Sequence, residues 1–452
     1  MRRPIQPHLI ALAVMLTAGC ANAPPTYRNA PPDPELLHAA MGQLTDVIVY
    51  DIFSPPQASR VYAYASIAAY EALRPGYPAQ RTLAGQVNGL TPVPQPAPGV
   101  EHYLPLASIR AFMTVSHALT FSRARMDSLR TAIEEPIRRM GIPAAVFERS
   151  VAYGDQVAQH ILAWSRQDHF LETRGYPKYT VTAAPGLWRP TPPAYMDAVE
   201  PNWTRLRPFA LDSSNQFRPK PPFPYDLTRG SPFFRQVNEV YEVGKHLTDE
   251  QRRIVAAWDD NPYVMHVRGH AMFATKKITP GGHWMGIAAI ASRKSGADLM
   301  QSAEAYARTA IALADGFISC WDEKFRSNLI RPETVINAYL DEQWQPQLQT
   351  PPFPEYTSGH SVISTAAATV LTDQFGAGFA FDDNAEVAYG LPVRSYASFD
   401  EAAAEAAISR LYGGIHYRMA IEEGVSQGRK VGELVVQRVR TREPASATVA
   451  GP

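Results

Sequence analysis

The chain contains 452 residues, with 43 Lys plus Arg against 43 Asp plus Glu, so its formal net charge is zero. This balance argues against a nucleic-acid-binding protein, because neutralising phosphates requires a surplus of basic residues, and two cysteines cannot form a disulfide framework. The 40 prolines, nearly twice the usual ~5%, indicate long irregular connections between compact elements.

The N-terminal segment predicts export rather than a folded element. A short apolar stretch follows two arginines and falls below the roughly 20 residues that a membrane-spanning helix needs. Residues 16–20, Leu-Thr-Ala-Gly-Cys, resemble the bacterial lipoprotein cleavage box, which implies a signal peptide over 1–19 and a lipid anchor on Cys20. Ala21 then favours the outer membrane, facing the periplasm; an ordinary secretory signal is the alternative. The prolines among residues 20–34 predict a flexible tether.

Residues 35–245 predict an N-terminal helical scaffold, because apolar residues recur there with helical spacing rather than strand alternation. The predicted helices cover residues 35–52, 58–73, 103–121, 122–140 and 143–165. Residues 169–232 are dense in proline and aromatic residues and show no sustained period. A segment this long without regular structure is expected to be a lid, a site wall or a wrapping segment.

Residues 246–440 predict a second, catalytic helical region. Thr248 and Gln251 fit a capping box at a helix start. Further helices are expected at residues 283–292, 297–321, 361–375, 400–411 and 418–438. No run of alternating strands or βαβ units is recognisable, so the predicted fold class is all-α. Residues 441–452 are expected to form a disordered tail, and Cys320 is expected to be a buried apolar side chain.

Three short segments in the last third of the chain share one chemical theme. In the first, Lys324 and Arg331 stand almost two helical turns apart, so both can project from one helix face. Pro332 disfavours helical backbone at Arg331 and places this side chain at a helix end. By itself, a basic pair of this kind is more often solvated surface.

The second segment places Ser358, Gly359 and His360 at the start of an apolar helix. Free backbone N–H groups at a helix start favour a bound anion, and Gly359 lets the backbone approach it closely. A simple N-cap by Ser358 with an incidental histidine is the alternative.

The third segment contains Arg410, a Gly413-Gly414 turn and His416. The guanidinium fork of Arg410 can bind an oxyanion while His416 approaches its central atom. A lone histidine is more often a satisfied core or surface group. Together, however, the three segments contain what a tetrahedral oxyanion requires: cations and donors for its oxygens, one histidine to attack or ligate the centre, and another to move protons.

In this order, Lys-x6-Arg-Pro, Ser-Gly-His and Ser-Arg-x5-His resemble the superfamily shared by vanadium-dependent haloperoxidases and type-2 phosphatidic acid phosphatases, over residues 321–425. The resemblance implies two packed helical bundles with long proline-rich loops. It implies that His416 is the axial vanadium ligand, or the nucleophile of a phosphatase, and that His360 is the acid–base group. The residues implied to bind the oxygens of vanadate or phosphate are Lys324, Arg331, Ser358, Gly359 and Arg410.

Two positions depart from the family pattern. Thr357 stands in place of the usual proline, and Ala420 stands in place of an aspartate four residues after His416. The resemblance then implies that another group orients His416, and the candidates are Glu422, Glu423 or a backbone carbonyl.

Four further residues are weaker candidates. Trp321 resembles the haloperoxidase version of the first motif and could form part of the site wall. His283, which follows a Pro-Gly-Gly turn, either lines the site or belongs to a structural turn. His266 and His270 stand four residues apart and could chelate a metal, but no third ligand is evident nearby.

The leading hypothesis is a vanadate-dependent haloperoxidase-like enzyme that oxidises a halide with hydrogen peroxide to a hypohalous acid equivalent, with an organic acceptor as a further small-molecule partner. The long helical scaffold before residue 321 supports it, and contact with a membrane is expected only through the lipid anchor. The alternative is a periplasmic acid phosphatase that hydrolyses phosphate esters through phospho-His416, with phosphate in place of vanadate. A surface lipoprotein that only binds ligands is a third hypothesis.

Overall fold

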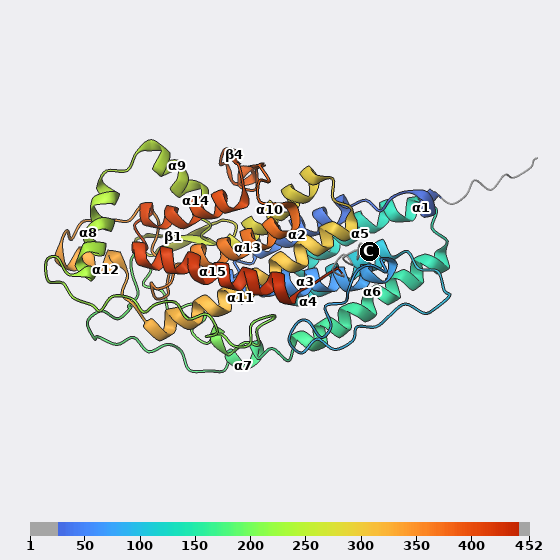
Figure 1. The fold of residues 1–452 in the computed structure, drawn as a ribbon, viewed down its shortest axis with the longest axis horizontal. Helices are drawn as coiled ribbons and strands as arrows, with labels where there is room; N and C mark the ends of the chain where they lie inside the picture. The colour runs from blue at the N-terminus through green and yellow to red at the C-terminus, as the bar shows by residue number, and fades with distance from the viewer. Residues whose placement is uncertain (1–25, 443–452) are drawn as a thin grey trace, which may run out of the picture.

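The computed structural model describes residues 26–442, which form an elongated and mostly helical molecule (Figure 1). The predicted signal peptide, Cys20 and the tail beyond residue 442 lie outside the described residues. The N-terminal half contains α1 (Thr26–Asn29), α2 (Glu35–Tyr50), α3 (Pro55–Leu73), η1 (Arg74–Gly76), α4 (Leu104–Leu119), α5 (Arg123–Arg139), α6 (Ala144–Ser165), α7 (Phe170–Thr173) and η2 (Trp203–Arg205). The C-terminal half contains α8 (Pro232–Lys245), α9 (Asp249–Ala257), α10 (Pro280–Ser295), α11 (Leu299–Ser327), α12 (Pro332–Tyr339), α13 (Gly359–Phe375), η3 (Val387–Tyr389), α14 (Phe399–Tyr412) and α15 (Arg418–Arg438).

Local capping explains where several of these helices begin. Ser54 accepts a hydrogen bond from the third residue of α3, whose first residue is Pro55. The predicted capping box at Thr248 is present at α9, and Asp298 forms a second capping box at α11. The sequence analysis missed α12, because its eight residues are too few to show a helical period.

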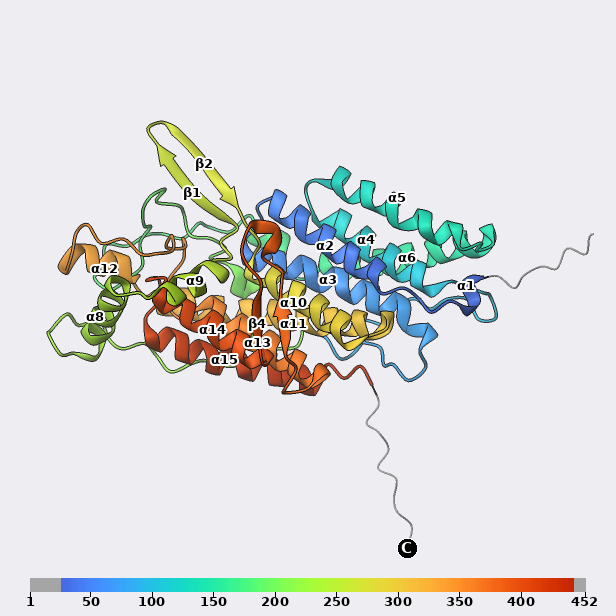
Figure 2. The same cartoon turned by 90° about the horizontal axis from the view of Figure 1, so that it is seen from above.

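Two groups of helices pack side by side, as the resemblance implied (Figure 2). Helices α2 to α6 form one group, and α10, α11, α13, α14 and α15 form the other. Because α3 packs against α11, one continuous apolar core runs through both groups. Helix α11 has 29 residues and is buried along most of its length, with Cys320 fully buried as expected.

A row of glycines on α15 lets it approach α13 closely. A Cβ atom on Gly428 would lie only 2.1 Å from the carbonyl oxygen of Val362 on α13. Gly424 and Gly432, one turn before and one turn after, are similarly close to α13. Residues four apart lie on one helix face, so this row fixes the position of α13, the helix that begins at the Ser-Gly-His motif.

Two short antiparallel hairpins correct the expectation that the chain has no strands. Strand β1 (Tyr263–Arg268) pairs with β2 (Ala271–Lys276), and β3 (Phe381–Asp383) pairs with β4 (Arg394–Tyr396). The first hairpin projects from the body of the molecule (Figure 2) and turns at Gly269. Its residues are at most half-buried on either face. Because neither face packs against a core, the strands do not show the alternation of apolar and polar residues by which a strand is predicted.

The ends of the described chain are attached more firmly than the sequence suggested. Within the expected tether at residues 20–34, Tyr27 is buried and donates a hydrogen bond to Glu101 at 3.0 Å. In the expected tail, the hydroxyl of Thr441 donates to Glu304. The tether prediction is therefore wrong for the part of it that the structure describes, and the body of the fold continues to residue 442.

Helix α8 packs on α12 and α14 of the C-terminal half. The predicted boundary after residue 245 therefore separates α8 from the helices that it contacts, and it is misplaced. Within residues 26–442, no helix combines the length and the apolar character needed to cross a membrane.

Candidate active site

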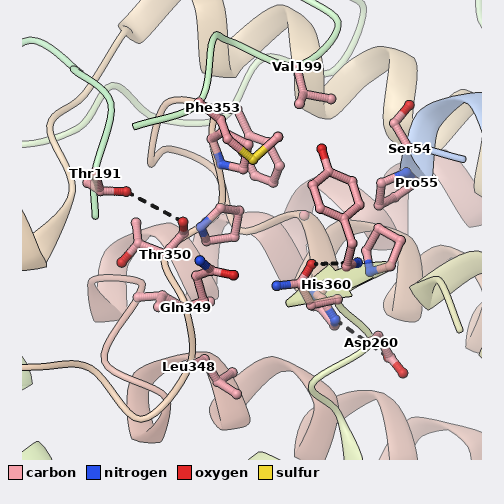
Figure 3. A pocket seen from close by; sticks show the side chains of 18 of the residues that line it. Ser54, Pro55, Thr191, Val199, Asp260, Leu348, Gln349, Thr350, Phe353 and His360 are labelled. Atoms are coloured by element: carbon pink, nitrogen blue, oxygen red, sulfur yellow. Dashed lines mark hydrogen bonds and ion pairs between the residues drawn. The ribbon is translucent and has the colours of Figure 1, made fainter. Parts of the chain in front are cut away.

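A cavity of about 980 Å³, which includes its open mouth, lies beside the start of α13 (Figure 3). Its walls contain parts of the segments 191–199, 259–263 and 348–353. The first of these belongs to the proline-rich segment 169–232, which therefore forms part of a site wall, as its composition suggests. The cavity is also lined by five residues that the sequence singled out: Trp321, Gly359, His360, Arg410 and His416.

His416 is held by a carboxylate from another segment. Its Nδ1 lies 2.8 Å from Oε1 of Glu355, and the same oxygen accepts a hydrogen bond from the backbone N–H of Tyr417 at 2.9 Å. Both His416 and Glu355 are buried. Because Nδ1–H donates to the carboxylate, the neutral ring keeps its lone pair on Nε2. This nitrogen is the one available to a central atom in the cavity.

The guanidinium of Arg331 reaches the same nitrogen from the N-cap position of α12. Its Nε donates to the carbonyl oxygen of Phe353 at 2.9 Å, and its Nη1 donates to that of Ile415 at 2.8 Å. Nη1 also lies 3.3 Å from Nε2 of His416. Nη2 is buried and has no hydrogen-bond partner in the described part of the chain.

Lys324, in the last turn of α11, is fully buried beneath the loop that carries Glu355. Its Nζ donates to the carbonyl oxygens of Pro354, Glu355 and Thr357 at 3.1, 3.0 and 2.5 Å. The ammonium group therefore fixes this loop and places a positive charge beside the imidazole of His416.

The Ser-Gly-His motif at the start of α13 contributes backbone N–H groups as well as side chains. Ser358 caps the helix, since its hydroxyl oxygen accepts the N–H of Ser361, and its own backbone N–H donates to the carbonyl oxygen of Ala420 at 3.0 Å. The N-cap interpretation of Ser358 is therefore correct. The backbone N–H groups of Gly359 and His360 are the next at the helix start, and neither has a hydrogen-bond partner among residues 26–442.

Arg410 is buried in the last turn of α14. Its Nε donates to the hydroxyl of Ser409 at 2.9 Å, and its Nη2 donates to the carbonyl oxygen of Trp258. These bonds fix the guanidinium on the wall of the cavity.

His360 is paired with a carboxylate that the sequence analysis did not single out. Its Nε2 lies 3.5 Å from Oδ2 of Asp260, which follows α9; this is an ion-pair distance, and neither atom has a hydrogen-bond partner within residues 26–442. Asp260 is buried and adopts a left-handed backbone conformation with φ 44°, which Asp tolerates better than most residues. The side chain of His360 is 16% exposed and borders the cavity.

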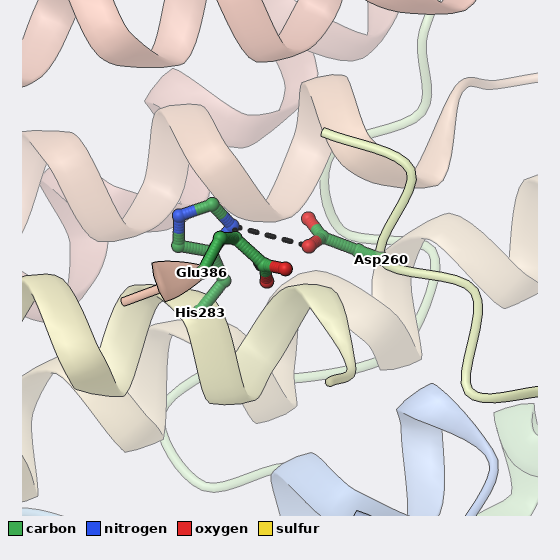
Figure 4. Close-up of side chains that lie close together, drawn as sticks. All are labelled: Asp260, His283 and Glu386. Carbon is green, nitrogen blue, oxygen red and sulfur yellow. Dashed lines mark hydrogen bonds and ion pairs between the residues drawn. The ribbon is translucent and has the colours of Figure 1, made fainter. Parts of the chain in front are cut away.

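His283 lies behind Asp260, in the first turn of α10 (Figure 4). Its Nδ1 is 3.1 Å from Oδ1 of Asp260, and its Nε2 is 2.7 Å from Oδ2 of Asp383 on β3. Its ring stacks on Trp258 with centroids 4.4 Å apart. His283 is not among the residues that line the cavity, but its neighbour Asp260 is.

Burial and neighbouring charges set the protonation states of the site. Burial lowers the pKa of Lys324 to about 8 and the pKa values of Arg331 and Arg410 to about 10, which leaves all three cationic near neutral pH. Burial, reinforced by Arg331 and Lys324, lowers the pKa of His416 well below its ordinary value. The imidazole of His416 is therefore neutral, as a nitrogen ligand or nucleophile must be.

The carboxylates of the two carboxylate–histidine pairs have pKa values shifted in opposite directions. Burial raises the pKa of Glu355 to about 7, although Arg331 and Lys324 oppose this rise. Burial and Arg410 lower the pKa of His360 to about 4, although Asp260 opposes this fall. Burial alone would raise the pKa of Asp260, but His283 reverses this and holds it below the ordinary value, so Asp260 is ionised.

Comparison with known proteins agrees with this geometry. The family model for the VCPO second helical-bundle domain matches residues 337–443. A solved structure of a bacterial vanadium-dependent iodoperoxidase is similar to the chain with 50% sequence identity and a TM-score of 0.87, covering 92% of this chain and 99% of that one. The chain belongs to the vanadium-dependent haloperoxidases.

More distant members of this family share the fold. The holo-type structure of a bacterial vanadium-dependent chloroperoxidase is 17% identical with a TM-score of 0.63, covering 92% of this chain and 96% of that one. The apo-type structure is 16% identical with a TM-score of 0.63, covering 87% and 94%. No curated protein sequence matches the chain significantly.

Within this haloperoxidase, the group that orients His416 differs from the candidates chosen from the sequence. Glu422 is exposed, and Glu423 pairs with Lys220 at 3.3 Å. Glu355 takes the role instead. A signal was present, since Glu355 stands three residues before Ser358 in the second motif, but only the folded chain brings it to the third motif.

The suggestion of a metal site at His266 and His270 is wrong in its geometry. His266 lies on β1 with its Nε2 3.1 Å from the hydroxyl of Thr275, and His270 is exposed in the hairpin turn. The i, i+4 spacing brings two histidines together only on a helix, whereas these residues stand on a strand and its turn.

Proposed function

We propose that this haloperoxidase binds vanadate at His416 and oxidises iodide with hydrogen peroxide to a hypoiodous acid equivalent. The observation that carries the proposal is the convergence of buried cations on a neutral histidine whose Nδ1 is held by Glu355 and whose Nε2 lies 3.3 Å from Nη1 of Arg331. Iodide is proposed as the halide because the relative with 50% identity is a vanadium-dependent iodoperoxidase.

The residues present fit an oxyanion. Arg331 is fully buried, yet its Nη2 has no acceptor among the described residues. A buried donor without an acceptor is costly, and Lys324 and Arg410 add two more buried positive charges close by. The backbone N–H groups of Gly359 and His360 point to the same need for an acceptor. Of the buried carboxylates, Glu355 carries one negative charge and Asp260 is paired with His283, so the cations are not balanced and a compact anion suits the site.

In the proposed roles, His416 Nε2 holds the vanadium, and the oxygens of vanadate are bound by Arg331, Arg410 and the backbone at Gly359. Ser358 shapes the helix start, and Lys324 contributes its charge from beneath the loop. When bound, vanadate acts as a Lewis acid that activates peroxide without changing its own redox state.

The other steps belong to the side chains of the chain itself. Glu355 accepts the Nδ1 proton of His416 and fixes the orientation of the ring. His360 stays neutral above pH values of about 4 and can therefore take a proton from hydrogen peroxide as it enters. Trp321 and the segment 348–353 narrow the cavity and exclude bulk water from the reacting atoms.

The phosphatase alternative is not favoured, because the similar structures are haloperoxidases and one of them is half identical to this chain. Export and lipid attachment at Cys20 remain proposals that rest on the Leu-Thr-Ala-Gly-Cys motif. Growth of the expressing cells on a labelled fatty acid tests them, because label should enter the wild-type protein and be absent from Cys20→Ser.

One experiment tests the function. The protein, stripped of vanadium by chelation at low pH and then supplied with orthovanadate, is assayed for triiodide formation from iodide and hydrogen peroxide, beside hydrolysis of p-nitrophenyl phosphate. Iodide oxidation that depends on vanadate and is lost in His416→Ala supports the proposal. Phosphatase activity inhibited by vanadate, without iodide oxidation, would overturn it.

A further inference from the structure

A buried cluster behind the cavity is not explained by the vanadate site. It consists of Asp260, His283, Asp383 and Glu386, which come from the loop after α9, from α10, from β3 and from the turn before η3. All four residues are buried. Asp260 links the cluster to the site, since it lines the cavity and its Oδ2 lies 3.5 Å from His360 Nε2.

Both ring nitrogens of His283 face carboxylates. Nδ1 lies 3.1 Å from Asp260 and Nε2 lies 2.7 Å from Asp383. A neutral imidazole has only one N–H, so two carboxylate acceptors on opposite sides require the doubly protonated ring. The cluster therefore contains a cation of its own, buried between two anions.

The remaining neighbours of His283 agree with this assignment. Burial raises the pKa of Glu386 to about 8, so this carboxyl group is mainly protonated at neutral pH and does not add a third negative charge. The ring of Trp258 stacks on the imidazole at 4.4 Å, and the carbonyl of Trp258 holds Arg410. An aromatic face next to a cation is favourable.

The three side chains Asp260, His283 and Glu386 also have ligand atoms within 4.8 Å of one another, as a metal site would. A metal ligand must present a lone pair, however, and both nitrogens of His283 are engaged as donors. The imidazolium already provides the positive charge that a metal ion would bring. We therefore expect no metal ion here, and a measurement of bound metal tests this.

We propose that the Asp383–His283 pair is a positioning device for His360: it keeps Asp260 ionised, and the negative charge of Asp260, 3.5 Å from Nε2, keeps the proton of His360 on that nitrogen. The opposite nitrogen, Nδ1, has no hydrogen-bond partner within residues 26–442. With its proton fixed on Nε2, the ring presents a lone pair on Nδ1 as the proton acceptor. Asp260, His283 and Asp383 are positioning residues that act through His360.

The physical reason is the cost of burying a charge. Asp260 is 3% exposed, and a carboxylate at such a position takes up a proton unless a cation compensates it. A protonated Asp260 would lose the negative charge that attracts the Nε2 proton of His360. The proton of the neutral imidazole would then move to Nδ1, and the base would be blocked.

The test locates the proton directly. The full chain is labelled with ¹⁵N-histidine, and long-range ¹H–¹⁵N correlations are recorded at pH 7 without vanadate, with the signals of His360 and His283 assigned from His360→Gln and His283→Gln. In the wild type we expect His360 to be protonated on Nε2 only and His283 on both nitrogens. In His283→Gln we expect His360 to lose the Nε2–H pattern and to gain protonation on Nδ1.

Further variants separate positioning from general damage to the fold. His283→Lys restores a cation and should return the proton of His360 to Nε2. Asp383→Asn weakens the Asp383–His283 pair and should also move the proton of His360 toward Nδ1. This variant replaces His283→Gln in the test if His283→Gln does not fold. His38→Gln is the matched control, since His38 is also buried but lies on α2 in the other helix group, where it bonds Tyr306 of α11 at 2.5 Å; it should leave His360 unchanged.

The catalytic consequence rests on the proposed function, whereas the position of the proton does not. In vanadate-loaded enzyme, His283→Gln should lower kcat for iodide oxidation at least about tenfold with little change in KM for iodide, because the base rather than the halide site is affected.

A wild type without iodide oxidation would defeat the proposed function and leave the NMR result to decide this inference. An unchanged Nε2–H pattern in folded His283→Gln would overturn it, as would the same change in His38→Gln. A stoichiometric divalent metal in the wild type, lost in His283→Gln, would also overturn it.

Discussion

Glu355 Oε1 lies 2.8 Å from His416 Nδ1, and this contact joins the second and third sequence motifs across the active site. The same carboxylate oxygen also accepts the backbone N–H of Tyr417, and the loop that carries Glu355 is held by Lys324. The orientation of His416, the proposed vanadium ligand, therefore depends on a residue from another segment of the chain.

Replacing Glu355 should weaken vanadate binding. Loss of the partner that orients a metal-ligating histidine typically lowers metal affinity by about 10- to 100-fold, so Glu355→Ala should raise the Kd for vanadate by that factor. Glu355→Gln should have a smaller effect, because its amide oxygen can still accept the Nδ1–H. The Kd is read from iodide oxidation as a function of added orthovanadate. Glu423→Ala is the control and should leave the Kd unchanged; an equal loss in both alanine variants would contradict the assignment.

The guanidinium shape of Arg331 should matter as well as its charge. Two of its nitrogens, Nε and Nη1, donate to the carbonyls of Phe353 and Ile415, which leaves Nη2 for the anion. A lysine cannot reproduce this fork, so Arg331→Lys should bind vanadate at least about tenfold more weakly, since each charge-assisted hydrogen bond contributes about 1.5–3 kcal/mol. Arg429→Lys, which alters an exposed pair with Asp400, is the control. Equal affinities in equilibrium dialysis would show that only charge is needed.

The activity should persist to unusually acidic pH. Burial and Arg410 lower the pKa of His360 to about 4, and because the lowered pKa keeps the imidazole neutral, the base remains available until the pH falls through that value. The acid limb of kcat/KM for hydrogen peroxide should therefore have its midpoint near pH 4, with circular dichroism confirming that the chain is folded at each pH. A midpoint near 6.5, the ordinary value for histidine, would mean that His360 is not the base or is not buried in solution.

The glycine row of α15 should limit what the fold tolerates. A Cβ on Gly428 would meet the carbonyl oxygen of Val362 at 2.1 Å, so Gly428→Ala must push α15 away from α13 and should cost about 1–3 kcal/mol of the free energy of unfolding. Gly42 on α2 has open space around its missing side chain, and Gly42→Ala should stabilise the protein by about 0.5–1 kcal/mol. Urea unfolding measures both. Equal effects of the two substitutions would contradict the close approach of α13 and α15.

The sequence predicted the helices and the site residues that lie within contiguous motifs. Lys324, Arg331, Gly359, Arg410 and His416 were identifiable because each stands at a fixed spacing from a proline, glycine or serine. In the structure, Gly359, Arg410 and His416 line the cavity, whereas Lys324 and Arg331 are buried and do not line it. Helical periodicity was informative because most helices are long and have one buried face, whereas the eight residues of α12 were too few.

The contacts that were not predicted all join segments distant in the chain. Asp260 reaches His360 across 100 positions, and its left-handed backbone has no local sequence signature. Glu355 looked like one acidic residue among many, because its burial and its pairing with His416 depend on how α11, α12 and α14 converge. Sequence spacing describes a single element well, but it does not encode which elements meet.

The central claim, that His416 anchors vanadate and that this complex oxidises iodide, is tested most directly by measuring bound vanadium and activity on the same samples. Protein loaded with orthovanadate is freed of excess by gel filtration, and vanadium is determined by elemental analysis beside the rate of triiodide formation. We predict one vanadium per wild-type chain, activity in proportion to bound vanadium, and loss of both in His416→Ala. Undiminished vanadium and activity in His416→Ala, or activity in vanadium-free protein, would contradict the claim.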